Sequence, residues 1–520
     1  MKTKYLFFFF ILLNISLFAQ APIIEWEKTY GGNVIEYCHD MLQTHDGGYI
    51  LIGSSYSNDG DVHGNYGYQK SSVWIVKTDA VGDTLWTKIY GSTGSDGGMS
   101  IKETSDGGYI VLASAGTNDE DLEGADLSIG KIWLIKLNSV GEIQWFNIVP
   151  KSALAFKQTF DGGYIISGIT GSNDSEGGIY HGGNGDASLV KLDSNGEMEW
   201  SRLYGGSEQE YAQNVIQTLD TGYLFVGFSR SGDYDVSYHY PGDYHNDIWV
   251  GKTDKDGVLV WEKPLGGTAS EDATDVYQYP ADSSYLIIAR VESSDYDITD
   301  YIGASDFWIA HLDKEDGTVI QSKSFGGSLN EHPYVLVPTS DGGFLIAGDT
   351  GSNDGDVHGS QGGDDMFIVK IDANYDTLWT KTLGGSEGEI AIAIHETVDG
   401  GIIVAGTTSS NNGDVTGNHG NQDYWLVKLK FSATEVSTLD RLATVTVSPN
   451  PSTDKVTIKQ LSPLKNISIE MTTIAGKSIF YETTVLREEY TIDISNFSNG
   501  IYLLTIYADN QQKTIKIIKK

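Results

Sequence analysis

The sequence predicts an all-β protein: a seven-bladed β-propeller with four-stranded blades, followed by a small Ig-like β-sandwich. Two markers recur about every 60 residues, a period typical of repeat architectures. The turn aspartates are Asp46, Asp106, Asp161, Asp220, Asp282, Asp341 and Asp399. The tryptophans are Trp26, Trp86, Trp145, Trp200, Trp261 and Trp379, with Gln321 in the remaining slot. Both markers therefore indicate seven repeats.

Each repeat contains four stretches of strand-forming sequence. In the first repeat these are residues 40–44, 48–54, 73–78 and 84–90, which alternate apolar and polar residues or are rich in β-branched and aromatic ones. An Asp-Gly-Gly turn joins the first two stretches, because glycine accepts a positive φ angle without strain. A long polar loop joins the second and third, and a D-x-x-G turn joins the last two. Four antiparallel strands per repeat are typical of a propeller blade.

The ends of the repeat region predict how the blades are arranged. Residues 23–32 resemble a fourth strand that has no first three strands before it, and residues 423–429 resemble a third strand with no fourth after it. The N-terminal strand can therefore complete the last blade, which leaves no unpaired edge. We expect a closed propeller over residues 22–430. A solenoid or two stacked sandwiches are the alternatives, and the complementary ends argue against both.

The first 19 residues have the pattern of a secretory signal peptide. Two lysines precede an apolar run over residues 5–18, and Ala19 is a suitable residue before cleavage. The run is too short to span a membrane comfortably, so we expect no transmembrane span in the mature protein. Cys38 is the single cysteine, which excludes an intramolecular disulfide. Core packing or bound ions must therefore stabilise the exported protein.

The charge is strongly acidic, with a formal net charge of −37. Such a surface repels nucleic acids and anionic membranes and attracts cations. The charge therefore argues against a nucleic-acid partner. Its simplest role is solubility outside the cell.

The C-terminal segment differs from the repeats. After a linker over residues 431–443, residues 444–520 contain short alternating strands, the Pro449-Asn450-Pro451 break, and turns at Gly476 and Gly500. With the Ser498–Tyr502 motif and the basic C-terminus, this segment resembles the type A C-terminal sorting domain of the type IX secretion system of the Bacteroidota. The resemblance implies recognition by the type IX secretion machinery. It also implies passage through the periplasm, followed by release or attachment at the cell surface.

Six acidic residues stand just before the first strand of six repeats, at the predicted mouth of the central channel. They are Glu36, Asp96, Glu210, Glu271, Glu331 and Glu389. One interpretation is a site for a cation or a cationic ligand. The alternative is a hydrogen bond to backbone N–H groups of a neighbouring blade, and we favour it because crowded carboxylates repel one another without partners.

The long loops repeat a second acidic element, as in SNDGDV at residues 57–62. The paired acids include Asp59 and Asp61, Asp119 and Asp121, and Asp354 and Asp356. Acids at this spacing can bind Ca²⁺, although calcium takes six to eight oxygens and each loop supplies only a few. The alternative is an Asx turn, in which the side chain bonds its own backbone.

The loop of the fourth repeat departs from the others and is the longest. It contains Tyr234, Tyr238, Tyr240, Tyr244, His239 and His245. Aromatic side chains with polar tips bind sugars and proteins well. We therefore predict a secreted or cell-surface protein whose propeller loops bind a glycan or a protein. An extracellular hydrolase or lyase acting on polysaccharide or peptide, or a structural surface protein, are the alternatives. No catalytic pair stands out from the repeat.

Overall fold

The computed structural model describes residues 21–67, 69–128, 131–149, 153–173, 179–242, 245–431, 445–459, 464–473, 477–486, 489–508 and 511–520. The predicted signal peptide, nearly all of the predicted linker, Tyr244 and Gly476 lie outside these residues. The chain divides into two compact units, Met1–Phe431 and Ser432–Lys520. Within the described residues, no helix has the length and hydropathy needed to cross a bilayer.

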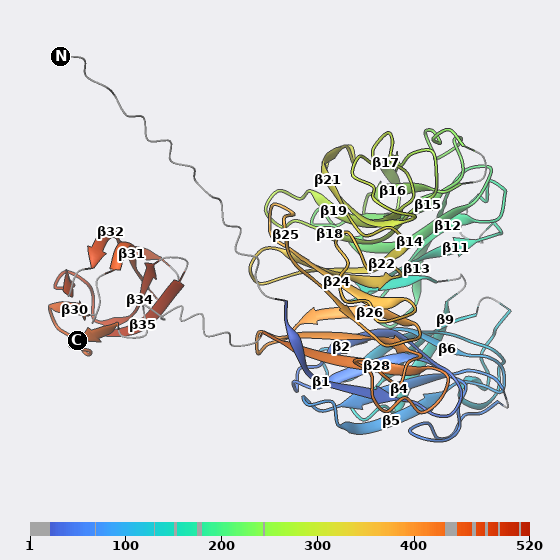
Figure 1. Ribbon diagram of the computed structural model, residues 1–520, viewed down its shortest axis with the longest axis horizontal. Coiled ribbons are helices and arrows are strands. Elements are labelled where there is room, and N and C mark those ends of the chain that lie inside the picture. The colour runs from blue at the N-terminus through green and yellow to red at the C-terminus, as the bar shows by residue number, and fades with distance from the viewer. Residues whose placement is uncertain are drawn as a thin grey trace, which may run out of the picture. The chain divides into compact units, whose positions relative to one another are not determined.

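The described residues of the first unit form seven sheets of four antiparallel strands, so the predicted all-β class and the four-stranded repeat are confirmed (Figure 1). The first sheet comprises β2 (Glu36–Gln43), β3 (Tyr49–Ser55), β4 (Ser72–Thr78) and β5 (Thr84–Tyr90). The second comprises β6 (Gly97–Glu103), β7 (Tyr109–Ser114), β8 (Ile132–Leu137) and β9 (Ile143–Val149), with the short 3-10 helix η1 (Glu120–Leu122) in its long loop. The third comprises β10 (Ala155–Gln158), β11 (Tyr164–Thr170), β12 (Asp186–Leu192) and β13 (Met198–Tyr204).

The next three sheets follow the same order along the chain. The fourth comprises β14 (Glu210–Gln217), β15 (Tyr223–Ser229), β16 (Asp247–Thr253) and β17 (Leu259–Leu265). The fifth comprises β18 (Glu271–Gln278), β19 (Tyr285–Val291), β20 (Asp306–Leu312) and β21 (Val319–Phe325). The sixth comprises β22 (Glu331–Pro338), β23 (Phe344–Thr350), β24 (Asp365–Ile371) and β25 (Thr377–Leu383).

The seventh sheet draws its strands from both ends of the repeat region. It comprises β26 (Glu389–Glu396), β27 (Ile402–Thr408), β28 (Asp423–Lys430) and β1 (Ile23–Tyr30). β1 pairs with β28 from Ile23 opposite Lys430 to Tyr30 opposite Tyr424. The predicted pairing of the N-terminal strand with the last third strand is therefore present.

The first strands of consecutive sheets contact one another. β2 contacts β6, β6 contacts β10, β10 contacts β14, β14 contacts β18, β18 contacts β22, β22 contacts β26, and β26 contacts β2. The middle strands are the most buried, and every residue of β3 and β4 is buried. A large apolar side chain buried in this way stabilises the fold by about 1.5–3 kcal/mol. The outer strands are only half-buried, as the pattern of β5 shows.

The recurrent Asp-Gly-Gly stretch is the turn between the first and second strands. In the first sheet, Asp46 Oδ1 accepts hydrogen bonds from the Gly48 N–H at 2.9 Å and the Thr44 hydroxyl at 2.6 Å. The buried Lys77 of the third strand also reaches this carboxylate, at 2.9 Å. Gly47 has a φ of 85°, and Thr221 and Ser283 take the same position with φ of 72° and 67°. The turn is therefore held by its aspartate even where glycine is missing.

The described residues of the second unit form two sheets. One comprises β29 (Thr446–Ser448), β30 (Lys455–Lys459) and β33 (Glu489–Asp493). The other comprises β31 (Leu464–Thr473), β32 (Ser478–Leu486), β34 (Gly500–Ala508) and β35 (Gln511–Lys519). Side chains of both sheets share one apolar core, for example Ile458 and Ile492 with Met471 and Leu504.

Candidate functional site

The six acids predicted at the channel mouth are buried at the joins between consecutive sheets. Their exposed fraction is 0–1%. Glu331 is representative: Oε2 accepts a hydrogen bond from the Gly327 N–H at 2.8 Å, and Oε1 accepts one from the Thr350 hydroxyl at 2.6 Å. Glu36, Glu210 and Glu389 repeat both bonds with Gly32 and Ser55, Gly206 and Ser229, and Gly385 and Thr408. Asp96 accepts bonds from Ser92 and Gly116. These acids therefore connect elements of the fold.

Glu271 is the exception among the glutamates. The strand position opposite it is Val291, where the equivalent residues are serine or threonine. Without that hydroxyl, Oε1 of Glu271 is buried and accepts no hydrogen bond from any described residue. Burial is the main cause that raises the pKa of Glu271 to about 7, and the charge of Asp247 raises it further. The fifth sheet thus begins with a carboxyl group that is poorly stabilised as an anion.

A second buried acid faces the glutamate at five of the joins. It is the first residue of the third strand of the preceding sheet: Asp186, Asp247, Asp306, Asp365 and Asp423. In each of them Oδ1 is buried and has no hydrogen-bond partner in the part of the chain that the structure describes. A Cβ atom on Gly326 would lie 2.3 Å from Asp306 Oδ1 and 2.6 Å from Glu331 Oε2, so both oxygens face the same small space. Burial raises the pKa of Asp306 to about 6.

The predicted loop acids bond to the backbone of the preceding fourth-to-first connection. The first acids Asp59, Asp119 and Asp354 accept hydrogen bonds from the N–H groups of Asn33, Thr93 and Ser328, at 2.8, 2.9 and 2.7 Å. The second acids Asp61, Asp121 and Asp356 accept them from Gly31, Gly91 and Gly326, at 3.2, 3.1 and 3.4 Å. The acidic loops therefore tie each long loop to its neighbouring connection.

The aromatic residues of the long loop between β15 and β16 in the fourth sheet, called the fourth loop below, divide into two groups. Tyr234 is 69% exposed and Tyr238 is 39% exposed. Tyr240 is buried, and its hydroxyl bonds Asp297 while its ring packs against Tyr296. Tyr234 and Tyr238 are therefore the tyrosines of this loop that offer a surface among the described residues.

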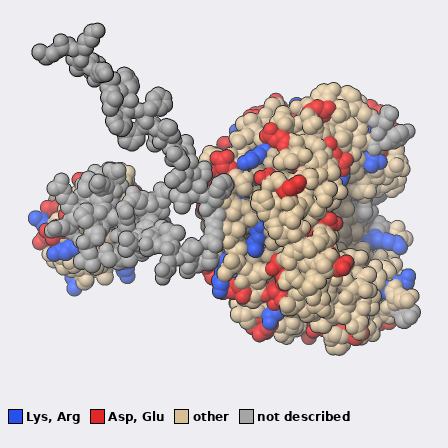
Figure 2. Space-filling view, in the orientation of Figure 1, with Lys and Arg blue, Asp and Glu red and all other residues tan. Residues whose placement is uncertain are grey.

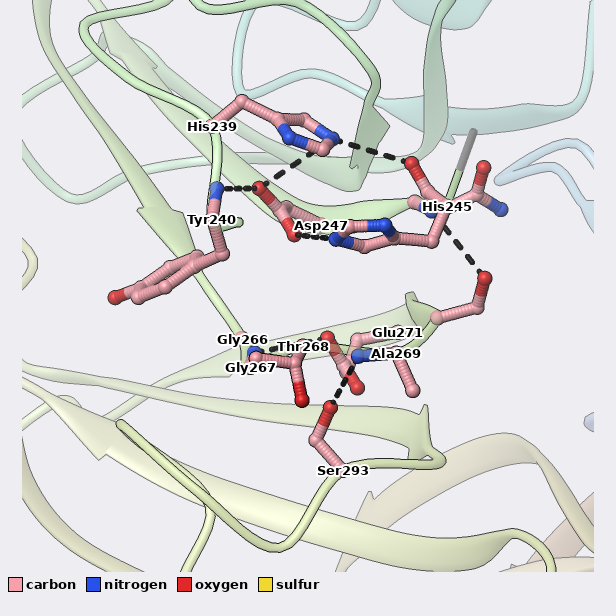
Figure 3. Close-up of polar contacts among 12 residues, drawn as sticks. His239, Tyr240, His245, Asp247, Gly266, Gly267, Thr268, Ala269, Glu271 and Ser293 are labelled. Carbon is pink, nitrogen blue, oxygen red and sulfur yellow. Dashed lines mark hydrogen bonds and ion pairs between the residues drawn. The ribbon is translucent and has the colours of Figure 1, made fainter. Parts of the chain in front are cut away.

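The two histidines of this loop lie against Asp247 (Figure 3). His239 Nε2 is 3.7 Å from Asp247 Oδ2, and His245 Nε2 is 3.6 Å from Asp247 Oδ1. One ligand atom from each of the three residues lies within 4.8 Å of the others. The Tyr240 N–H donates to Asp247 Oδ2 at 2.7 Å and orients the carboxylate. Sequence reasoning found both histidines but missed their convergence on Asp247. The spacing H-x5-H-x-D was the available signal.

A pocket of about 330 Å³ opens beside these histidines. It is lined by Asn184, Glu208, Gln209, Arg230, His239, Gly242 and His245. Arg230 donates through Nε to Asn246 Oδ1 at 2.7 Å. Asn246 in turn donates to Asp272 at 2.5 Å, and Arg290 donates to the same carboxylate at 2.6 Å. This polar chain leads to a second pocket of about 340 Å³, lined by Gln213, Phe228, Asn246, Asp272, Arg290, Tyr334 and their neighbours.

Acidic side chains are common on the surface of the repeat unit. Acidic side chains are spread over the face of the repeat unit that is visible in Figure 2 rather than gathered in one patch. Arg230 and Arg290 are therefore unusual in this unit, and both lie beside the loop that departs from the repeat. The sequence contains the signal, since arginine is rare before residue 431, but sequence reasoning did not use it.

Solved structures give only distant similarities. A protein of unknown function from Bacteroides caccae is 12% identical and covers 60% of this chain and 90% of that chain, with a TM-score of 0.36. The acylaminoacyl peptidase of Pyrococcus horikoshii is 10% identical and covers 82% of this chain and 58% of that chain, with a TM-score of 0.39. TM-scores this low carry no argument about fold or function. No curated protein is similar enough to count as a relative.

The C-terminal unit gives a definite match. Residues 446–520 match the family described as the secretion system C-terminal sorting domain. The match covers the Pro449-Asn450-Pro451 motif and Gly500, on which the resemblance in the sequence rests. Residues 446–520 are therefore a type IX secretion sorting domain, and the protein is exported to the cell surface or secreted.

Proposed function

We propose that the seven sheets are the blades of a seven-bladed β-propeller over residues 22–430, and that residues 444–520 form an Ig-like sorting domain. Two observations support the propeller. Consecutive first strands contact one another, including β26 with β2. β1 pairs with β28, so the chain from the start of the repeats completes the last sheet. We also propose residues 1–19 as a signal peptide and residues 431–443 as the linker.

The exported propeller is proposed to be a binding protein rather than an enzyme. The observation that carries this proposal is the pocket beside Arg230, His239 and His245, in the loop that departs from the repeat. The acid whose pKa best suits general acid–base chemistry is Glu271, but its side chain is fully buried and bonded to the Gly267 N–H. A buried, backbone-bonded carboxyl group cannot reach a substrate.

The ligand is proposed to carry a carboxylate or a similar anionic group, as acidic glycans and peptides do. Within the described residues Arg230 has no carboxylate partner, while Arg290 is paired with Asp272 and Glu292. A guanidinium binds a carboxylate through two parallel hydrogen bonds, which gives both strength and orientation. The exposed tyrosines Tyr234 and Tyr238 lie in the same loop and offer surfaces for the rest of the ligand.

Calcium stabilisation is proposed at the joins rather than at the exposed loop tips. The second acid of each loop pair lies close enough to the buried aspartates to raise their pKa. Asp356 raises the pKa of Asp306, and Asp61 raises the pKa of Asp423. A hard divalent cation relieves repulsion among carboxylates. A melting temperature that is the same in calcium and in EDTA would remove this part of the proposal.

The binding function is tested with the purified full chain on a glycan array and an acidic peptide panel. We expect Arg230→Gln to weaken binding of the best ligand at least tenfold, because it removes a charged bidentate donor. Arg202→Gln is the matched control, since Arg202 lies on the outer strand of the third sheet over Trp200. Equal loss in both variants would contradict a site at Arg230. Cleavage of a panel member by the wild-type protein would favour the hydrolase alternative.

A further inference from the structure

The joins between sheets offer a natural comparison for the fourth loop. At the third-to-fourth and seventh-to-first joins, one histidine contacts the buried aspartate. His181 Nδ1 lies 3.1 Å from Asp186 Oδ2, and His419 Nδ1 lies 2.7 Å from Asp423 Oδ2. At the fourth-to-fifth join two histidines contact Asp247, one at each carboxylate oxygen. The repeated sequence supplies the buried carboxylate at each of these joins. The long loop of the fourth sheet, which departs from the repeat, adds a second imidazole beside Asp247.

The three side chains are buried enough to bind an ion strongly. The exposed fraction of the side chain is 17% for His239, 8% for His245 and 1% for Asp247. Asp247 Oδ1 accepts no hydrogen bond from the described residues, so a buried carboxylate oxygen remains for another partner. An unpaired buried acceptor costs free energy that a bound cation recovers.

The separations suit a small tetrahedral ion. Ligand atoms about 2.0–2.2 Å from a tetrahedral zinc ion lie roughly 3.3–3.6 Å from one another. The distance from His239 Nε2 runs to Asp247 Oδ2 and that from His245 Nε2 to Oδ1, and one ligand atom from each of the three residues lies within 4.8 Å of the others. Side-chain movements of about 1 Å close the set. In this movement His239 Nε2 leaves the carbonyl oxygen of His245, which lies 3.2 Å away. Two imidazoles with one carboxylate bind zinc in preference to calcium. Zinc accepts imidazole nitrogen as a ligand, whereas calcium takes oxygen ligands.

The local backbone holds the histidine ring in place. A Cβ atom on Gly242 would lie 2.0 Å from Cε1 and 2.4 Å from Nδ1 of His245. The ring therefore packs directly on the glycine backbone, and any side chain at residue 242 would displace it. The Tyr240 N–H fixes the carboxylate of Asp247 from the other side of the loop. Both ligands are thus positioned by the main chain of the same loop.

We propose that His239, His245 and Asp247 bind a zinc-class divalent metal ion, with the fourth ligand position open to the pocket that Arg230 lines. Three protein ligands and one open position are the arrangement of zinc sites that bind an exogenous oxygen. Another oxygen of the ligand would take this position while the Arg230 guanidinium binds the ligand's carboxylate. That last step rests on the proposed function, whereas the metal site does not.

The metal site is tested on the full chain without any ligand. The protein is stripped with a chelator, dialysed against zinc, and its bound zinc is measured by mass spectrometry. Cobalt replaces zinc in a parallel sample to give a visible spectrum. We expect one zinc per chain, a tetrahedral cobalt spectrum, and at least 100-fold weaker binding for His239→Ala and His245→Ala. Gly242→Ala should weaken binding while every ligand remains.

His419→Ala is the matched control, because His419 contacts an equivalent buried aspartate alone. It should bind zinc as the wild type does. The proposal is overturned if the wild-type protein retains no zinc, or if His245→Ala binds zinc as tightly as the wild type. Loss of zinc in His419→Ala as well would indicate a general effect of folding and would also overturn it. Loss of ligand binding in Arg230→Gln with zinc retained separates the proposed function from the metal site.

Discussion

A disulfide between β1 and β28 tests whether the N-terminal strand closes the repeat region. Ile23 and Lys430 are register partners and both are exposed. Partners in an antiparallel pair have Cα atoms about 4.5–5.5 Å apart, within the range that a disulfide spans. We therefore expect Ile23→Cys with Lys430→Cys to form a disulfide in air without a change of backbone.

The expected stabilisation follows from the length of chain that the bond encloses. Residues 23–430 form a loop for which the chain-entropy relation gives about 6 kcal/mol, although engineered disulfides commonly deliver less. The free energy of unfolding is measured by denaturant titration of the oxidised and reduced forms. We expect the oxidised form to be more stable by about 3–6 kcal/mol.

The assay counts free thiols in the native protein and compares mobility on a non-reducing gel. Cys38 is buried and should stay unreactive until the protein unfolds. Ile23→Cys with Ile320→Cys is the control, because Ile320 is an exposed residue on β21 of a sheet that does not adjoin the seventh. If the thiols at residues 23 and 430 remain as reactive as those of the control, the reasoning about closure is wrong.

Three further substitutions test the buried acids and the turn, each by denaturant unfolding in EDTA. Val291→Thr restores a hydroxyl donor to Glu271, so the pKa of Glu271 should fall from about 7 and stability at pH 8 should rise by about 1 kcal/mol; no gain would contradict the account of the missing donor. Thr221→Gly relieves a threonine at a φ of 72° and should stabilise by roughly 1 kcal/mol; a loss of stability would show that the turn is not strained. The pKa of Asp306 is raised to about 6, so the folded protein binds the extra proton and loses stability as the pH rises from about 4 to 6. Asp306→Asn should therefore gain about 2–3 kcal/mol at pH 8 and nothing at pH 4; an equal gain at both pH values would exclude this cause.

The repeat could be predicted from the sequence because each of its features has a local cause. The Asp-Gly-Gly turn, the apolar second and third strands and the unpaired strands at the two ends all follow from residues close in the chain. Only the bounds shifted: the first strand of the first sheet begins at Glu36, four residues before the predicted start. That strand begins at the buried acid, whose bonds to the Gly32 N–H and the Ser55 hydroxyl cannot be read from periodicity.

The candidate site could be predicted only in part. Its loop was recognised because it is aromatic. The expectation that it is the longest loop was wrong, because residues 230–246 and the equivalent residues 115–131 of the second sheet have the same length. The convergence of His239 and His245 on Asp247 depends on how the loop folds back over the start of β16, which no pattern of residue types specifies. The pairing of each glutamate with an aspartate from the preceding sheet depends on contacts between residues far apart in the chain. Such contacts are set by the packing of sheets and not by local sequence.

The central claim is that the repeated strands and turns form the scaffold, and that the long loop of the fourth sheet, which departs from the repeat, forms the ligand-binding site. A loop exchange tests it most directly: residues 230–246 are replaced by residues 351–364 of the sixth sheet, which leaves Asp247 in place. Binding of the best ligand from the array is then measured by calorimetry alongside the melting temperature. The account predicts that binding falls at least tenfold while the melting temperature stays close to that of the wild type. Unchanged binding would contradict it.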